Sequence, residues 1–139
     1  CLAAQGATVV ATEVEPALSA LRRSVARNCA CWEGRGVVIV EELRWGGEEE
    51  WPASVAGGGP FDVVVGADLL YSRALRPPLL STLRRVPMRH ETAVVLAYEA
   101  RGDEARFVAE ASRELGAPIR CAHGPDARGV EVVVLEVQR

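Results

Sequence analysis

The chain has 139 residues, of which 49% are hydrophobic and 25% charged, and its formal net charge is −3 at pH 7. This composition fits one domain with a core of its own, over residues 1–139, and the charge disfavours general nucleic-acid binding. No apolar run is long enough to span a membrane. Four cysteines and two isolated histidines predict neither a disulfide scaffold nor a metal site. We therefore expect a monomer in the cytoplasm, or alternatively in the nucleus, without nucleic-acid, membrane or metal partners.

The first part of the chain predicts two strands joined by a helix. Residues 8–12 form an apolar, β-branched run typical of a buried parallel strand, and Glu13 follows it. A helix opens at Glu15-Pro16, since proline is favoured in the first turn. Residues 37–40 form a second apolar strand, and a polar loop extends from residue 41 to residue 60.

The rest of the chain alternates strands and helices and then ends in a hairpin. In chain order, we predict a strand over 61–68, a helix over 74–86, a strand over 92–98, a helix over 103–115 capped by Asp103, and strands over 118–122 and 130–137. Only residues 123–129 join the last two strands, which is too short for a parallel crossover. The final strand should therefore be antiparallel to its neighbour.

This order predicts an α/β fold with a doubly wound, mostly parallel sheet and a C-terminal antiparallel hairpin. The opening residues 1–6 lack an initiator methionine. They resemble the tail of a helix that ends at a glycine cap, so we expect that a segment precedes Cys1.

Candidate site residues follow the strands, because a doubly wound sheet binds ligands at the carboxyl ends of its strands. Glu13 could accept hydrogen bonds from both hydroxyls of a ribose, although taken alone it fits a solvated turn carboxylate better. Trp45, within Leu43-Arg44-Trp45-Gly46, could lie flat on a purine or pack as a lid on the edge of the sheet.

Asp68 and Tyr71 follow the most hydrophobic strand. Desolvation is costly for a carboxylate at the end of such a strand, and groups of this kind are usually paired or functional. A turn can bring the Tyr71 ring beside the carboxylate, where the two would hold an amine. An Asp that caps the next helix and a Tyr in the core fit the spacing slightly better. Glu99 and Arg101, after the next strand, fit a surface ion pair.

Taken together, these segments resemble family 16 of the class I, seven-β-strand S-adenosylmethionine-dependent methyltransferases, the methyltransferase-like 21 type that methylates protein lysines. The resemblance covers nearly the whole chain, and its most diagnostic part is D-x-x-Y at Asp68–Tyr71. Its segments are Val10-Ala11-Thr12-Glu13, Leu43-Arg44-Trp45-Gly46, Phe61-Asp62-Val63-Val64-Val65-Gly66-Ala67-Asp68-Leu69-Leu70-Tyr71 and Tyr98-Glu99-Ala100-Arg101. A Rossmann-like sheet with a terminal hairpin also matches this class.

The resemblance implies S-adenosyl-L-methionine as cofactor and a protein lysine as acceptor, with chaperones and translation factors among the expected substrates. It also implies a role for each candidate residue. On the cofactor side, Glu13 would bind the ribose, Trp45 would flank the adenosine and Ala67 would offer backbone contacts. On the acceptor side, Asp68 and Tyr71 would line the lysine channel as the catalytic pair. Glu99 and Arg101 would shape the substrate side.

One departure from the family is clear: its first strand and its Gly-rich E/D-x-G-x-G loop are missing. The resemblance therefore implies an N-terminally truncated domain, and we expect the isolated chain to bind the cofactor weakly or not at all.

Three alternatives remain open at this point. A nicotinamide-dependent oxidoreductase would also use Glu13, but the terminal hairpin argues against it, because the parallel dinucleotide fold continues through crossovers. A catalytically inactive fragment that serves as an interaction module is the second. A methyltransferase that acts on a non-lysine acceptor is the third.

Overall fold

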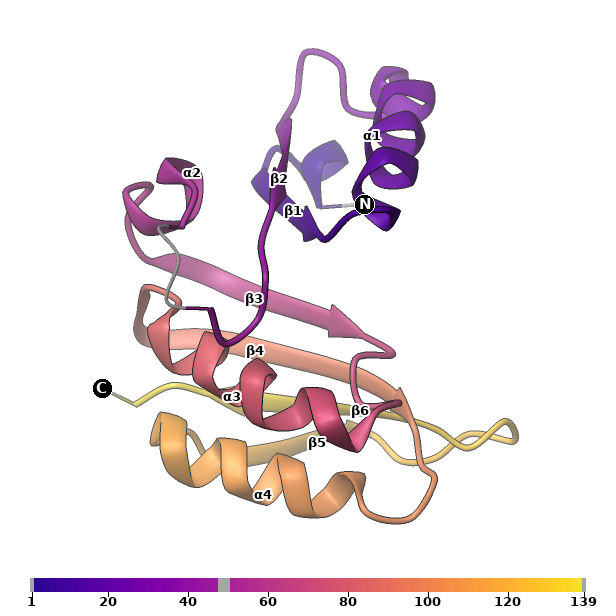
Figure 1. Ribbon diagram of the computed structural model, residues 1–139, viewed down its shortest axis with the longest axis vertical. Helices are drawn as coiled ribbons and strands as arrows, with labels where there is room; N and C mark the ends of the chain where they lie inside the picture. The colour runs from indigo at the N-terminus through magenta and orange to yellow at the C-terminus, as the bar shows by residue number, and fades with distance from the viewer. Residues whose placement is uncertain (1, 48–50, 139) are drawn as a thin grey trace. The chain divides into compact units, whose positions relative to one another are not determined.

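The computed structural model describes residues 2–47 and 51–138, so Cys1 lies outside the described part. The chain forms two compact units (Figure 1). Unit 1 comprises Cys1–Arg44 and Glu48–Gly58, and unit 2 comprises Trp45–Gly47 and Gly59–Arg139. Within the described ranges, no helix is long and apolar enough to cross a membrane.

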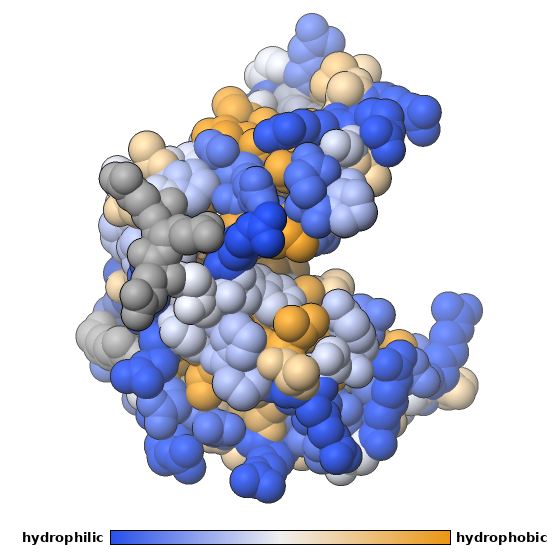
Figure 2. All heavy atoms as spheres, in the orientation of Figure 1, coloured by the Kyte–Doolittle hydropathy of each residue, from blue (hydrophilic) through white to orange (hydrophobic). Residues whose placement is uncertain are grey.

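Unit 1 is built on a parallel pair of strands joined by a helix. Its elements are η1 (Ala3–Gln5), β1 (Thr8–Glu13), α1 (Ala17–Asn28), η2 (Cys29–Cys31), β2 (Val37–Glu42) and α2 (Ala53–Ala56). β1 and β2 are in parallel register from Thr8↔Val37 to Glu13↔Glu42, as predicted. α1 buries Leu18 and exposes Arg22, Arg23 and Arg27. Hydrophilic and hydrophobic side chains lie side by side on the face of unit 1 that Figure 2 shows.

Two details of unit 1 concern its turns. Gly6 ends η1 with φ +92°, as the glycine cap predicted. The single turn α2 follows Pro52 inside the segment predicted to be a loop. Four residues are too few to display a helical period, so periodicity could not reveal α2.

Unit 2 is a four-stranded mixed sheet with two helices. Its elements are β3 (Phe61–Ala67), η3 (Arg73–Leu75), α3 (Arg76–Arg85), β4 (Met88–Glu99), α4 (Glu104–Leu115), β5 (Ile119–His123) and β6 (Val130–Glu136). The strand order is β3-β4-β6-β5. β3 and β4 are parallel, whereas β6 is antiparallel to both β4 and β5. The predicted terminal hairpin is therefore confirmed.

β4 begins earlier than predicted, at Met88 instead of Thr92. Thr92 explains the extension, because it is fully buried and ties the polar start of the strand to β3. Its hydroxyl donates to the carbonyl of Phe61 at 2.7 Å and accepts the Arg89 N–H at 2.9 Å. A tertiary contact thus overrides the weak strand propensity of the residues before Thr92.

The core of unit 2 lies between its helices and one face of the sheet. α3 and α4 contact each other and lie side by side on that face (Figure 1). Alternate residues of the strands and helically spaced residues of α3 and α4 meet there. The buried set includes Leu79, Leu83, Val94, Leu96, Tyr98, Phe107, Val108, Ala111, Leu115, Val133, Leu135 and Val137. This packing holds the carboxyl ends of β3 and β4 at one edge.

Candidate active site

The parallel pairing of β3 and β4 brings the two predicted substrate-side loops together. Ala67 pairs with Ala97, and the N–H of Asp68 donates to the carbonyl of Ala97 at 2.8 Å. Asp68 has φ +53°, a left-handed conformation that Asp tolerates better than most residues. Backbone strain of this kind clusters at functional sites. The chain therefore turns at Asp68, directly beside the end of β4.

Asp68 and Tyr71 are both exposed, and the Tyr71 side chain is among the most exposed large hydrophobic ones. The expectation of a desolvated Asp68 is therefore wrong. The physical reason is that β3 is an edge strand of its sheet, and Val65 of the same strand is exposed too. The alternative, in which Asp68 caps the next helix and Tyr71 belongs to the core, is also wrong. No side-chain cap precedes η3 or α3, and Tyr71 lies outside the core.

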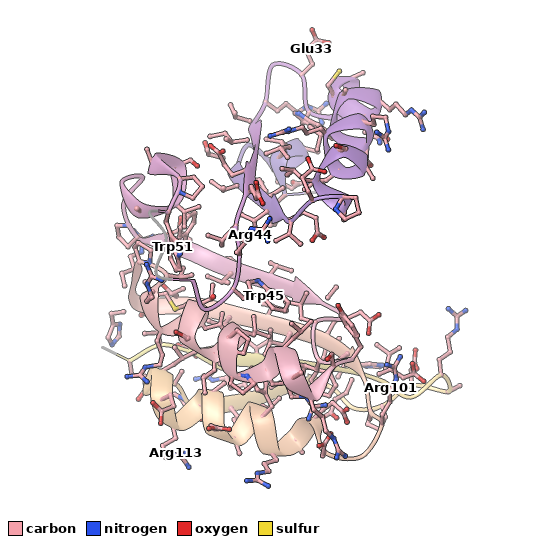
Figure 3. The ribbon with its side chains drawn as sticks, viewed as in Figure 1. Glu33, Arg44, Trp45, Trp51, Arg101 and Arg113 are labelled. Atoms are coloured by element: carbon pink, nitrogen blue, oxygen red, sulfur yellow. The ribbon has the colours of Figure 1, made fainter. Side chains whose placement is uncertain are left out.

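Glu99 and Arg101 form the surface ion pair that the sequence allowed, with Nη2 2.7 Å and Nε 3.2 Å from Oε2 of Glu99. Figure 3 shows Arg101 in the loop between β4 and α4. The hydrogen bond and the charge of Glu99 raise the pKa of Arg101, and the charges of Asp68 and Glu104 add smaller contributions.

A partly buried ion-pair network lies beneath these loops, and the sequence did not reveal it. Arg76, at the start of α3, contacts Asp103 at 2.7 Å and Glu104 at 2.9 Å. Arg73 adds a contact to Asp103 at 2.8 Å. The predicted start of α4 is confirmed within one residue, but Asp103 makes no capping hydrogen bond. Its carboxylate pairs with the two arginines instead.

Glu104 organises the turn before α4. Its Oε2 accepts the N–H groups of Arg101 and Gly102 at 2.9 and 2.8 Å. Burial raises the pKa of Glu104, but the N–H groups of Glu104, Arg101 and Gly102, together with the Arg76 charge, outweigh that effect, so the pKa is lowered. Glu104 is therefore ionised at neutral pH although it is only 4% exposed.

Trp45 is half-buried and packs against the core of unit 2 (Figure 3), in agreement with a hydrophobic lid. Gly46 follows with φ +72° and donates its N–H to the buried hydroxyl of Thr82, at 2.9 Å. A Cβ on Gly46 would lie 2.7 Å from the Cβ of Pro78. Only glycine fits both the conformation and the space, which explains the W-G pair. Thr82 shares the inward face of α3 with Leu79 and Leu83, so its helical spacing could have identified it as buried.

Replacing Gly46 with alanine should lower the free energy of unfolding by about 2 to 4 kcal/mol, since left-handed strain adds to overpacking against Pro78. Gly59→Ala is the matched control: Gly59 has φ +83°, and a Cβ on it would meet nothing within 4 Å, so it tests strain without the clash. Urea denaturation of both variants measures the difference. Equal losses would show that the contact with Pro78 is unimportant.

Glu13 belongs to unit 1, where it ends β1 and is exposed. Its Oε1 accepts the N–H of Val14 at 3.0 Å, and its carbonyl accepts the N–H of Leu43 at 3.1 Å. No described residue donates to its Oε2. An exposed carboxylate with an open acceptor oxygen is chemically suited to a ribose diol.

In the described part of the chain, no three side chains of His, Cys, Asp or Glu lie close enough together to hold a metal ion. Cys29 and Cys31 are free, exposed thiols.

Known proteins of similar structure are methyltransferases. A methyltransferase from Pyrococcus furiosus matches with a TM-score of 0.60 and 17% identity, over 95% of this chain and 64% of that one. A SAM-dependent methyltransferase from Methanosarcina mazei matches with a TM-score of 0.62 and 12% identity, over 99% of this chain and 85% of that one. These likenesses show the fold alone, and they confirm the predicted Rossmann-like α/β fold.

Comparison of the amino-acid sequence with known proteins identifies the family. The chain is 36% identical over 107 residues to protein N-lysine methyltransferase METTL21A of Danio rerio, a match that covers 76% of this chain and 46% of the relative. The chain thus spans about half the length of that protein. The sequence profile of the lysine methyltransferase family matches residues 1–114, and the chain belongs to this family.

Proposed function

We propose that the protein containing this chain transfers a methyl group from S-adenosyl-L-methionine to a lysine side chain of another protein. Family membership supports the reaction class. The observation that carries the proposal is the placement of an exposed Asp68 and Tyr71 at the end of β3, beside the Glu99–Arg101 pair at the end of β4. An acidic and an aromatic side chain exposed on the same loop suit a long, cationic side chain.

The acceptor nitrogen is the nucleophile. When bound, the cofactor supplies a methyl group on a positively charged sulfur. The lysine nitrogen first gives up its extra proton to solvent. Its lone pair then forms the new N–CH₃ bond as the S–CH₃ bond breaks, and the electron pair of that bond stays on sulfur. We assign to Asp68 the task of orienting the amine, and to Tyr71 that of lining its path.

Deprotonation of the acceptor must precede transfer, because an ordinary lysine has a pKa of about 10.4 and only its neutral form is nucleophilic. A carboxylate near an amine favours the charged form. Asp68 therefore serves better in binding and positioning the acceptor than as an obligatory base, and its exposure leaves water able to take the proton. Catalysis then rests mainly on positioning.

For the cofactor, we propose that Glu13 binds the ribose, that Trp45 flanks the adenosine and that the backbone at Ala67 contributes contacts. The open Oε2 of Glu13 supports the first assignment, since described residues occupy only Oε1. The ordered Trp45-Gly46 turn, held by Thr82, supports the second. Ala67 lies directly before the turn at Asp68, where backbone groups come to the edge of the sheet.

We also propose that residues 1–139 form one methyltransferase domain, since the family match begins in unit 1 and continues through most of unit 2. The protein should act as a monomer in the cytoplasm, in keeping with its free thiols, and should not need nucleic acid. Its substrates are expected among abundant proteins such as chaperones and translation factors.

Label transfer tests the function. The whole natural protein is incubated with radioactive S-adenosyl-L-methionine and a lysate, and labelled bands are hydrolysed to methylated amino acids. We expect methyl-lysine in a discrete band. This chain contains no lysine, since its sixteen basic residues other than histidine are all arginine, so methyl-lysine cannot come from these residues. Another methylated amino acid would favour a different acceptor, and no transfer by folded protein would favour the interaction module.

A further inference from the structure

Arg76 is a partly buried cation beneath the loops that carry the candidate catalytic residues. Its side chain is 12% exposed, and each of its three guanidinium nitrogens has a partner. Nε and Nη2 donate to the carbonyl of Leu70 at 3.3 and 2.9 Å. Nη1 donates to Asp103 at 2.7 Å, and Nη2 also donates to Glu104 at 2.9 Å.

On one side, Arg76 holds the loop after β3. Leu70 lies between Asp68 and Tyr71, and its side chain is buried in the core at 2% exposure. The N–H of Asp68 is tied to β4. The loop is therefore attached at the Leu70 side chain, at the Asp68 N–H and at the Leu70 carbonyl. Of these three attachments, the one at the Leu70 carbonyl is made by a charged side chain, that of Arg76.

On the other side, Arg76 holds the loop after β4 through Glu104. One oxygen of Glu104 accepts from Arg76, and the other accepts the N–H groups of Arg101 and Gly102. The guanidinium thus links the carbonyl of Leu70, in the loop of Asp68 and Tyr71, to the turn that presents Arg101.

We propose that Arg76 is a positioning residue of the methyl-transfer site, whose bridge from Leu70 to Glu104 fixes the spacing between the Asp68–Tyr71 loop and the Glu99–Arg101 loop. This inference rests on the proposed function. A buried ion pair adds little stability over well-packed apolar side chains, so stability alone is a weak reason for these charges. The planar guanidinium fork, in contrast, fixes direction as well as distance.

The substitution Arg76→Lys tests whether the geometry of the guanidinium matters beyond its positive charge. Lysine keeps the cation but has a single nitrogen, which cannot serve Leu70, Asp103 and Glu104 in the same geometry. In the whole natural protein, we expect kcat to fall about 10- to 100-fold, because small misplacements of reacting groups have effects of this size. KM for S-adenosyl-L-methionine should stay within about twofold. The variant is assayed at a temperature at which circular dichroism shows it fully folded.

Arg84→Lys is the matched control, assayed at the same temperature. Arg84 also joins α3 to α4, through Glu114 at 3.4 Å, but its side chain is 59% exposed and lies about two turns further along α3. Its kcat should equal that of the wild type. A second measurement does not depend on activity: hydrogen exchange at the amides of Asp68, Arg101 and Gly102 should become faster in Arg76→Lys and stay unchanged in Arg84→Lys.

Faster exchange at both loops together with a fall in kcat would support the proposal. Faster exchange with wild-type kcat, or a loss of kcat that Arg84→Lys shares, would overturn it. If Arg76→Lys does not fold, Glu104→Gln breaks the same bridge from its other end and replaces it in both measurements. Absence of transfer by the wild-type protein would refute the proposed function and the catalytic meaning of the bridge, whereas the exchange data would still decide whether Arg76 joins the two loops.

Discussion

Replacing Asp68 with asparagine should lower methyl transfer about 100-fold and leave cofactor affinity largely intact, because lost orientation of the acceptor amine costs about this much. Asparagine keeps the size of the side chain and tolerates the left-handed conformation found at φ +53°, so the variant removes the charge and little else. Single-turnover transfer to the acceptor found by label transfer measures the first effect, and titration with S-adenosylhomocysteine measures the second.

Two companion variants sharpen this experiment. Asp68→Ala adds left-handed strain of about 1 to 2 kcal/mol, so a loss confined to Asp68→Ala would point to the backbone and not to the charge. Asp62→Asn changes the same residue type near the start of β3, where Asp62 is exposed and pairs with Arg89, and it should transfer at the wild-type rate. Comparable losses of transfer and cofactor affinity in Asp68→Asn would contradict the assignment of Asp68 to the acceptor side.

The sequence was sufficient for those features that depend on order and periodicity. The alternation of apolar runs and amphipathic segments predicted the parallel pairs, and the short connection at residues 123–129 predicted the antiparallel hairpin, because chain length alone forbids a crossover. Parallel pairing then places Asp68 and Glu99 at the same edge of the sheet, so two of the candidate site loops could be brought together from the sequence.

Features that depend on particular tertiary partners could not be predicted in this way. Nothing in the sequence distinguishes Arg76 from the other arginines, because its partial burial and its partners arise only when α3 packs against α4. Local rules assign helix capping to Asp103, yet its carboxylate pairs with arginines instead. The neighbouring Glu104 accepts the backbone N–H groups of the turn, and the local rules do not reveal this exchange. The exposure of Asp68 likewise depends on its place in an edge strand, which the apolar run over 61–68 does not reveal.

Glu104→Gln should lower the free energy of unfolding at pH 7 by about 1 to 3 kcal/mol, because a buried charged network loses one of its acceptors. The wild-type carboxylate serves Arg76 with one oxygen and two backbone N–H groups with the other. A glutamine amide has a single oxygen, so one of these two sets loses its acceptor. Glu114→Gln is the control, since Glu114 is also on α4 but pairs with the exposed Arg84, and its cost should be below about 1 kcal/mol.

The pH dependence of this cost tests its electrostatic origin. The pKa of Glu104 is lowered in the folded protein from an ordinary value of 4.5. Its contribution to stability is therefore fully present above pH 4.5 and is lost as the pH falls through the lowered pKa of the folded state. The difference between wild type and Glu104→Gln should shrink below pH 4.5, because protonation removes from the wild type the same charge that the substitution removes. Urea denaturation above, at and below that pH measures it, and a difference that stays constant over this range would mean that packing, and not the charge of Glu104, holds the two loops.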